Sequence, residues 1–172
     1  MTFNYHNKND IFGPNGAVER ISDKTVPLKG TVFVDSNGDA YIIEGVAIRE
    51  ADLEVMIFYE VKPSKNQFYQ CQRLKYWANF LVFPYMNELV VKTKDLESLT
   101  DKELPMKTET YQHYKGDTYE IINHAVESYD CTHFIIYKDK NNEYPFNWCR
   151  PLYQWSEIVE LYGKKIKRFT KL

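Results

Sequence analysis

The residues best suited to bind an anion lie in two short segments of the last third of the chain. In the first segment, His113 and Lys115 flank a tyrosine directly before Gly116. A lysine ammonium supplies a point charge, and a glycine lets the backbone come close to a ligand. This segment therefore predicts an anion-binding turn. The structural alternative is that His113 hydrogen-bonds a neighbouring strand while Lys115 is solvated.

The second segment carries Trp148 and Arg150, two positions apart on an expected strand and therefore on one face of it. An arginine beside a tryptophan forms a platform for a base, another ring or a carboxylate. The structural alternative pairs Arg150 with a carboxylate such as Glu157, while Trp155 packs in the core. Arg150 is the stronger functional candidate of this group.

Metal and thiol chemistry find little support in the sequence. His124, Cys131 and His133 could meet across a hairpin, but no fourth ligand stands at zinc-site spacing, so no metal site is predicted. Cys71 and Cys149 are expected to be buried apolar side chains. The chain lacks the signatures of serine hydrolases, P-loop proteins, dinucleotide-binding enzymes and zinc proteases. We therefore assign no catalytic residue and no cofactor.

An internal repeat organises the elements that must position these residues. Identical residues recur at one constant separation without a gap, which predicts two copies of one unit. We call this separation, the one between Gly38 and Gly116, the repeat offset. The repeated tyrosines are expected to pack in the core, and Tyr119 is also a candidate ligand contact. Tyr41 and Arg73 are the corresponding candidates in the first copy. The identical pairs are Gly38/Gly116, Asp39/Asp117, Tyr41/Tyr119, Ile43/Ile121, Ala47/Ala125, Asp52/Asp130, Ile57/Ile135, Tyr59/Tyr137, Lys62/Lys140, Phe68/Phe146, Cys71/Cys149, Leu74/Leu152 and Trp77/Trp155.

Each copy is rich in β-branched and aromatic residues between turn-forming segments, which indicates strands. A tight 3₁₀-like turn is expected at Leu152 to Ser156, after Pro151 ends the preceding strand. The expected strands are 40–48, 53–61, 68–73, 118–126, 132–139, 146–150 and 157–162.

This pattern predicts a mainly β protein of two tandem, small SH3-like β-barrel units joined by a short helical linker. The expected boundaries are residues 1–85 for the N-terminal barrel, 86–108 for the linker and 109–172 for the C-terminal barrel. Thr100 and Glu103 form a candidate capping box within the linker.

A pattern of aromatic, basic and turn residues runs through the last third of the chain. Its members are Tyr111, His113, Tyr114, Lys115, Gly116, Tyr119, Ile121, Ile135, Ile136, Tyr137, Trp148, Arg150, Pro151, Leu152, Trp155, Glu157, Val159, Gly163, Lys164, Arg168 and Phe169. In these residues the chain resembles the bacterial and phage family known as domain of unknown function 1653.

One departure from that family is a Glu-Ser-Tyr-Asp stretch at 127–130, where the family carries His-Ser-Glu-Thr. The first copy looks like a diverged relative, with Gln72 and Arg73 where the second has Arg150 and Pro151. The resemblance implies a fold and not a function.

Composition narrows the classes of partner. A net charge of -2 and a pI of about 6.1 disfavour a globally basic nucleic-acid or membrane binder. Three cysteines argue against a secreted disulfide scaffold, and neither a signal peptide nor a membrane span is indicated. We expect a cytoplasmic protein. The lysine-rich stretch 164–171 is either a solvated edge or a local phosphate-attracting patch.

The leading hypothesis is a non-enzymatic binding protein with an aromatic and arginine-lined groove between the two copies. Its expected ligand is a nucleotide or small anion, a single-stranded nucleic acid, or a host protein bound by a phage accessory or anti-defence protein. One alternative is an enzyme that uses His113, Lys115 and Arg150 on a nucleotide or modified base. Another alternative is a structural or assembly protein. The oligomeric state and the site of the first copy stay open.

Overall fold

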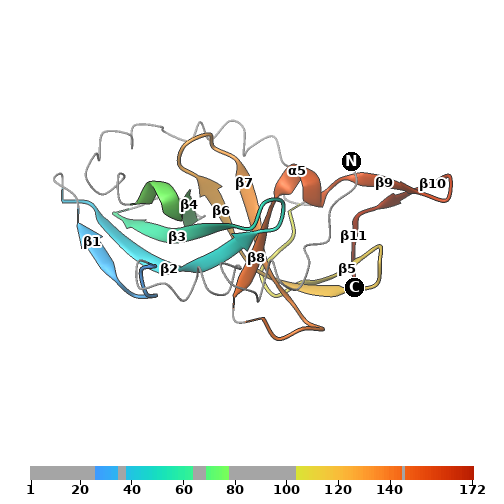
Figure 1. The fold of residues 1–172 in the computed structure, drawn as a ribbon, viewed down its shortest axis with the longest axis horizontal. Coiled ribbons are helices and arrows are strands. Elements are labelled where there is room, and N and C mark those ends of the chain that lie inside the picture. Colours follow the sequence, from blue (N-terminus) through green and yellow to red (C-terminus); the bar gives the residue numbers. More distant parts are fainter. Residues whose placement is uncertain (1–25, 35–37, 64–68, 78–103, 145) are drawn as a thin grey trace.

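The chain folds as a mainly β protein built around a closed six-stranded barrel (Figure 1). The computed structural model describes residues 26–34, 38–63, 69–77, 104–144 and 146–172. Within these ranges, no helix has the length and apolar character that a membrane crossing needs.

The elements of the N-terminal half are β1 (Val32–Val34), β2 (Ala40–Arg49), β3 (Glu54–Lys62), β4 (Tyr69–Arg73) and a helical turn at 74–77. The C-terminal half contains β5 (Thr110–His113), β6 (Thr118–Glu127), β7 (His133–Asp139), β8 (Asn147–Pro151), α5 (Leu152–Trp155), β9 (Ile158–Leu161), β10 (Lys164–Lys167) and β11 (Phe169–Lys171).

Three strands from each half close the barrel. Its order is β6-β4-β3-β2-β8-β7, and β7 pairs with β6 to complete the ring. Within each half the pairings are antiparallel, whereas the two joints between halves, β4–β6 and β2–β8, are parallel. The two halves therefore share one closed sheet. The description of each half as an SH3-like unit stays a prediction.

The two halves follow the same path along the chain. The bounds of β2 and β6 are separated by the repeat offset, and so are those of β4 and β8. Both long strands carry a bulge, between Ile43 and Gly45 in β2 and between Ile121 and Asn123 in β6. The joints repeat as well, because Tyr69 pairs with Ala125 in one and Asn147 with Ala47 in the other.

One cluster of buried side chains takes members from all six barrel strands and therefore fills the interior. Its members are Ala47, Met56, Phe58, Cys71, Ala125, Phe134, Ile136 and Cys149. The next residues along the strands point outward, because side chains alternate between faces. They form two outer clusters, one under α5, β5 and β11 and one under β1 and the turn at 74–77.

The expected strands of both halves are confirmed, and β8 ends at Pro151 as predicted. The expected tight turn at Leu152 is a single α-helical turn. β9 is not the last strand, because the lysine-rich segment continues into β10 and β11. Most of the expected helical linker, including Thr100 and Glu103, lies outside the described residues.

Candidate functional site

Three of the predicted binding residues meet around the ring of Phe169 on β11. The His113 ring lies 4.9 Å from it, the Tyr119 ring 5.9 Å, and the Arg150 guanidinium carbon 5.4 Å. They come from β5, β6 and β8, and Phe169 stacks in turn on Trp155 at 3.8 Å. His113, Tyr119 and Arg150 therefore form one group in the outer cluster of the C-terminal half.

Arg150 pairs with a carboxylate of the other half. Its Nε donates to Glu50 Oε2 at 3.0 Å, its Nη2 forms an ion pair with the same oxygen, and the Tyr137 hydroxyl also donates there. Burial opposes the charge of Arg150, but the Tyr137 hydroxyl and Glu50 outweigh it and raise the pKa of Arg150. Burial likewise opposes the charge of Glu50, and Arg150 outweighs it, so the pKa of Glu50 is lowered.

The sequence offered Glu157 as an alternative partner of Arg150, but Arg150 pairs with Glu50 and Glu157 pairs with Arg168. Glu157 accepts two hydrogen bonds from Arg168, at 3.1 and 2.6 Å. Sequence reasoning missed Glu50 because it is far from Arg150 along the chain and no local motif marks it.

His113 is a neutral imidazole at pH 7. Burial lowers its pKa from 6.5 to about 4, and the charges of Arg150, Arg168 and Lys115 act in the same direction, against Glu50. A third cationic charge is therefore unfavourable beside these two buried guanidiniums. The surroundings of His113 therefore keep the imidazole uncharged.

Lys115 lies apart from that group, whereas Trp148 belongs to the same outer cluster but packs on other rings. Lys115 is exposed in the turn between β5 and β6, with its Nζ 5.6 Å from the centre of the Tyr114 ring. Trp148 is buried against Phe146 and Tyr144, at ring distances of 5.0 and 5.5 Å. The predicted site residues therefore divide between a buried group, a surface turn and an aromatic packing cluster.

The corresponding position in the N-terminal half lacks the ion pair. At the repeat offset, Gln72 corresponds to Arg150, and Ser128 corresponds to Glu50. Gln72 Oε1 is buried and has no hydrogen-bond partner within the described residues. The candidate Tyr41 is buried against Tyr59, with ring centres 5.8 Å apart.

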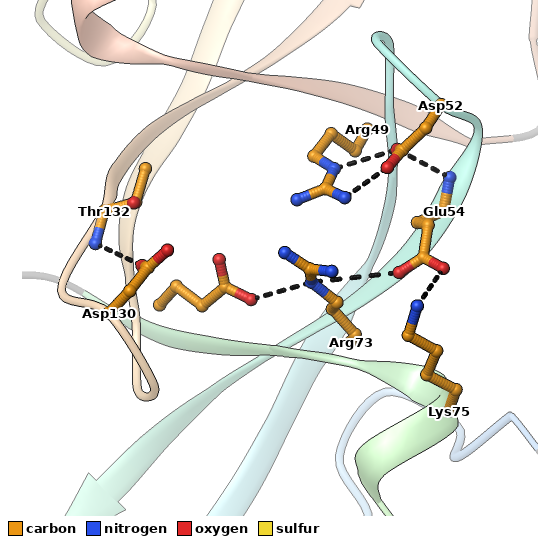
Figure 2. A network of polar contacts seen from close by, with 8 residues as sticks. Arg49, Asp52, Glu54, Arg73, Lys75, Asp130 and Thr132 are labelled. Carbon is orange, nitrogen blue, oxygen red and sulfur yellow. Dashed lines mark hydrogen bonds and ion pairs between the residues drawn. The ribbon is translucent and has the colours of Figure 1, made fainter.

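Arg73, the other candidate of the N-terminal half, belongs to a charged network at one end of the barrel (Figure 2). Its Nε lies 3.1 Å from Glu127 Oε1 and 3.8 Å from Glu54 Oε2. The other oxygen of Glu54 lies 2.6 Å from Lys75 Nζ. Burial and the nearby Asp130 raise the pKa of Glu127, against the charge of Arg73. Arg73 thus neutralises two carboxylates.

Arg49 and Asp52 form a further pair at this end, with Arg49 Nε 2.8 Å from Asp52 Oδ1 (Figure 2). The equivalent positions of the C-terminal half hold Glu127 and Asp130, so an arginine in one half corresponds to a carboxylate in the other. Both aspartates accept a backbone N–H two residues on, at Glu54 and Thr132. The two turns therefore share a backbone conformation but differ in charge.

The histidine and cysteine candidates for a metal site do not assemble one within the part of the chain that the structure describes. His124 Nδ1 lies 2.9 Å from His133 Nε2, and burial lowers the pKa of both rings. Cys71 and Cys149 are buried free thiols, and burial raises their pKa. Burial therefore disfavours the thiolate form of both cysteines, which nucleophilic chemistry requires.

A pocket of about 840 Å³ opens at the other end of the barrel, where β4 and β8 begin. Phe58 of the barrel interior contributes to its wall, and the bulge at Gly45 brings the backbone close, because a Cβ there would lie 3.3 Å from the Phe58 ring. Both halves contribute equivalent positions, Gly45 and Tyr69 from one and Asn123 and Asn147 from the other.

The charges around this pocket are mixed. Lys29 pairs with Glu44 at 3.4 Å, and Lys138 pairs with Glu120 at 3.2 Å. Two further lysines of the pocket make no ion pair with another described residue. These two lysines are Lys107 and Lys140.

Comparison with known proteins adds a family match. Residues 109–171 match the family described as "Protein of unknown function (DUF1653)", which confirms the resemblance of the last third of the chain. The match spans β5 to β11 and contains Arg150 and His113, but it excludes Glu50. It gives no support to a second copy in the N-terminal half. No curated protein and no solved structure matches the chain.

Proposed function

We propose that this protein is a non-enzymatic binding protein that takes a nucleotide, or a similar small anionic ligand with an aromatic ring, in the pocket at the barrel end. The observation that carries the proposal is the pocket itself. Its volume of about 840 Å³ falls in the range of ligand pockets, roughly 300–1,000 Å³. Both halves line it, as expected for a groove between two related units.

The lining has the chemistry that a planar heterocycle needs. Tyr69, Tyr144 and Phe146 offer aromatic surface, and the side-chain amides of Asn123 and Asn147 offer donors and acceptors. Aromatic stacking and amide hydrogen bonds are the usual means of holding a base. This part of the pocket accounts for the ring of the ligand.

The anionic part of the ligand is assigned to Lys107 and Lys140. Neither makes an ion pair with another described residue, so a phosphate would not have to displace a protein carboxylate. Lys29 and Lys138 are already paired, which limits the pocket to one or two phosphates. The mixed charge of the rim also fits the overall net charge of -2.

In this proposal Arg150 acts as a positioning residue. Its ion pair with Glu50 joins the two halves on whose relative position the pocket depends. His113, Tyr119 and Trp148 pack behind it or beside it and hold β8 in place. They are not assigned direct contacts with the ligand.

We also propose that the N-terminal half is a diverged second copy of the matched domain. The support is that strand bounds, bulges and the two parallel joints all recur at the repeat offset. A solution structure of a single-copy relative would test this proposal. A barrel with a different strand order in that relative would contradict it.

The binding test is a thermal-shift screen with mononucleotides, dinucleotides and cyclic nucleotides, followed by calorimetric titration of any hit. A ligand at a hundredfold excess over its dissociation constant stabilises the native state by about 2.7 kcal/mol. We expect Lys107→Ala and Asn147→Ala to weaken binding at least tenfold with an unchanged melting temperature of the free protein. Lys75→Ala, at the opposite end of the barrel, is the control and should bind like the wild type.

A screen in which no nucleotide raises the melting temperature, or equal affinity of Lys107→Ala and the wild type for a ligand, would contradict the proposal. Capture of a host protein in the manner of a phage anti-defence factor, turnover of a nucleotide or modified base, and an assembly role stay predictions. The purified protein incubated with each hit ligand and analysed by mass spectrometry separates binding from turnover.

A further inference from the structure

The hairpin of β9 and β10 extends from the barrel at one end of the molecule (Figure 1). The strands pair from Ile158 with Lys167 to Leu161 with Lys164, so the connecting turn consists of Tyr162 and Gly163. The hairpin lies outside the barrel sheet and forms a separate two-stranded sheet. No other described strand pairs with the outer edge of β9 or of β10.

Tyr162 at the tip is 96 % exposed, the most exposed of the large apolar side chains of the described residues. Its φ is 51°, and that of Gly163 is 75°, so both turn residues have the positive φ that a type I′ hairpin turn requires. Asn or Asp is preferred at the first of these positions, and a bulky aromatic residue is unfavourable there. An exposed ring on a strained backbone, with no ring contact to another described residue, points to a binding role.

β10, which follows this turn, carries three lysines, with Lys164 on one face and Lys165 and Lys167 on the other. Lys164, Lys165 and Lys167 are exposed, and none forms an ion pair with another described residue. Glu160 is the only carboxylate on the hairpin strands, in register with Lys165. The hairpin therefore carries an excess of positive charge although the whole chain has a net charge of -2.

The base of the hairpin adds Lys115 to this surface. Tyr114 N donates to Arg168 O at 3.0 Å, so the turn that carries Lys115 lies beside the end of β10. Arg168 and Lys171 at the same end form ion pairs with Glu157 and Glu109.

We propose that the β9–β10 hairpin binds single-stranded nucleic acid, with Tyr162 stacking on a base and the lysines of β10 contacting phosphates. Stacking by an exposed ring requires an unpaired base, which favours a single strand over a duplex. A protein partner is less suited, because three of the four apolar residues of the strands, Val159, Leu161 and Ile166, are half-buried. The fourth, Ile158, is 54 % exposed but lies at the base of the hairpin, away from Tyr162. This site is separate from the pocket of the proposed function.

Fluorescence anisotropy with a labelled twelve-nucleotide oligo(dT) tests the proposal on the full chain, at several NaCl concentrations from about 50 to about 200 mM, the range over which phosphate contacts show their salt dependence. We expect Tyr162→Ala to weaken binding about tenfold, as the loss of one stacked base does, and Tyr162→Phe to bind like the wild type. Tyr162→Asn keeps a favourable turn residue and should weaken binding as much as Tyr162→Ala. This variant excludes misfolding of the hairpin as the cause.

The triple change of Lys164, Lys165 and Lys167 to Gln should reduce the slope of log affinity against log salt by about 2, because each phosphate contact contributes about 0.7 for a single strand. A Lys62→Gln, Lys75→Gln double variant, with both changes outside the hairpin, should keep the wild-type slope. Lys107→Ala should bind the oligonucleotide normally, which separates this test from that of the pocket.

Three results would overturn the proposal. They are no binding of oligo(dT) at the lowest salt concentration, tighter binding of a duplex of the same length, and wild-type affinity in Tyr162→Asn. Vesicles that contain anionic phospholipid provide a further arm. Binding to these vesicles without binding to oligo(dT) would assign the lysines to a lipid surface and would equally overturn the proposal.

Discussion

Arg150 joins the two halves through a buried ion pair. Its side chain is 4 % exposed, and its carboxylate partner Glu50 belongs to the turn that follows β2. Residue type and spacing singled out Arg150 as a candidate ligand contact, which stays a prediction, but they could not supply Glu50. That partner depends on the β2–β8 joint, and no periodicity in the sequence encodes which strands become neighbours.

Replacing Arg150 should therefore destabilise the protein. We expect Arg150→Ala to lower the free energy of unfolding by about 3 kcal/mol, at the low end for a broken buried pair because Glu50 is partly exposed. Urea denaturation measures the loss. The double variant Glu50→Ser, Arg150→Gln installs the residue types found at Ser128 and Gln72. It should be more stable than Arg150→Ala, and strict additivity of Glu50→Ser and Arg150→Gln would contradict a direct pair.

His113 should make stability depend on pH. The unfolded chain binds a proton near pH 6.5, whereas the folded chain binds it only near pH 4, since burial and Arg150 lower the pKa of His113. Stability is thus lost as the pH falls from about 6.5 to about 4. His113→Asn should flatten the fall in unfolding free energy measured between pH 7 and pH 4.5. The pKa of His133 is also lowered to about 4, so this residue contributes in the same direction. An unchanged dependence of unfolding free energy on pH in a variant with both His113 and His133 replaced by Asn would refute this origin.

At the scale of elements, strand content was predictable where apolar and polar residues alternate. β2, β3, β6 and β7 are rich in β-branched and aromatic residues and were predicted within a few positions. β10 was not predicted, because lysines occupy three of its four positions and hide the alternation. Its strand conformation comes from pairing with β9 through a tight turn.

The turn of this hairpin should become more stable when its strain is removed. Tyr162→Asn places a preferred residue at the position with a φ of 51° and should stabilise the hairpin by about 1 kcal/mol. Amide hydrogen exchange of β10 residues should slow several-fold, whereas exchange in the barrel strands should not change. Faster exchange in β10 would mean that the Tyr162 ring itself stabilises the turn.

At the scale of the whole molecule, the sequence repeat predicted two related halves but not how they combine. Alternation assigns residues such as Ala47 and Ile48 to opposite faces of β2. Alternation alone does not show that one of these faces lines the interior of a barrel that the strands of the other half complete. The parallel joints β4–β6 and β2–β8 are long-range contacts between residues that share no local signal.

A C-terminal half on its own should not form a stable dimer. Residues 104–172 supply only three barrel strands, and a second copy would place Ser128 beside Arg150 and would leave Glu127 without Arg73. We expect Glu127→Arg with Ser128→Glu, the types found at positions 49 and 50, to allow this fragment to dimerise. Analytical ultracentrifugation measures the outcome. A stable dimer of the unchanged fragment would contradict the importance of these charges.

The unequal charges at equivalent positions have a consequence for self-recognition. Each half presents a charge that is neutralised by the opposite half and not by another copy of itself, as Arg73 neutralises Glu127 and Glu50 neutralises Arg150. Like-with-like association would bring together uncompensated charges, which costs several kcal/mol. The two halves of one chain are therefore complementary in charge. If the chain were cut between them, the two fragments would select each other over their own kind.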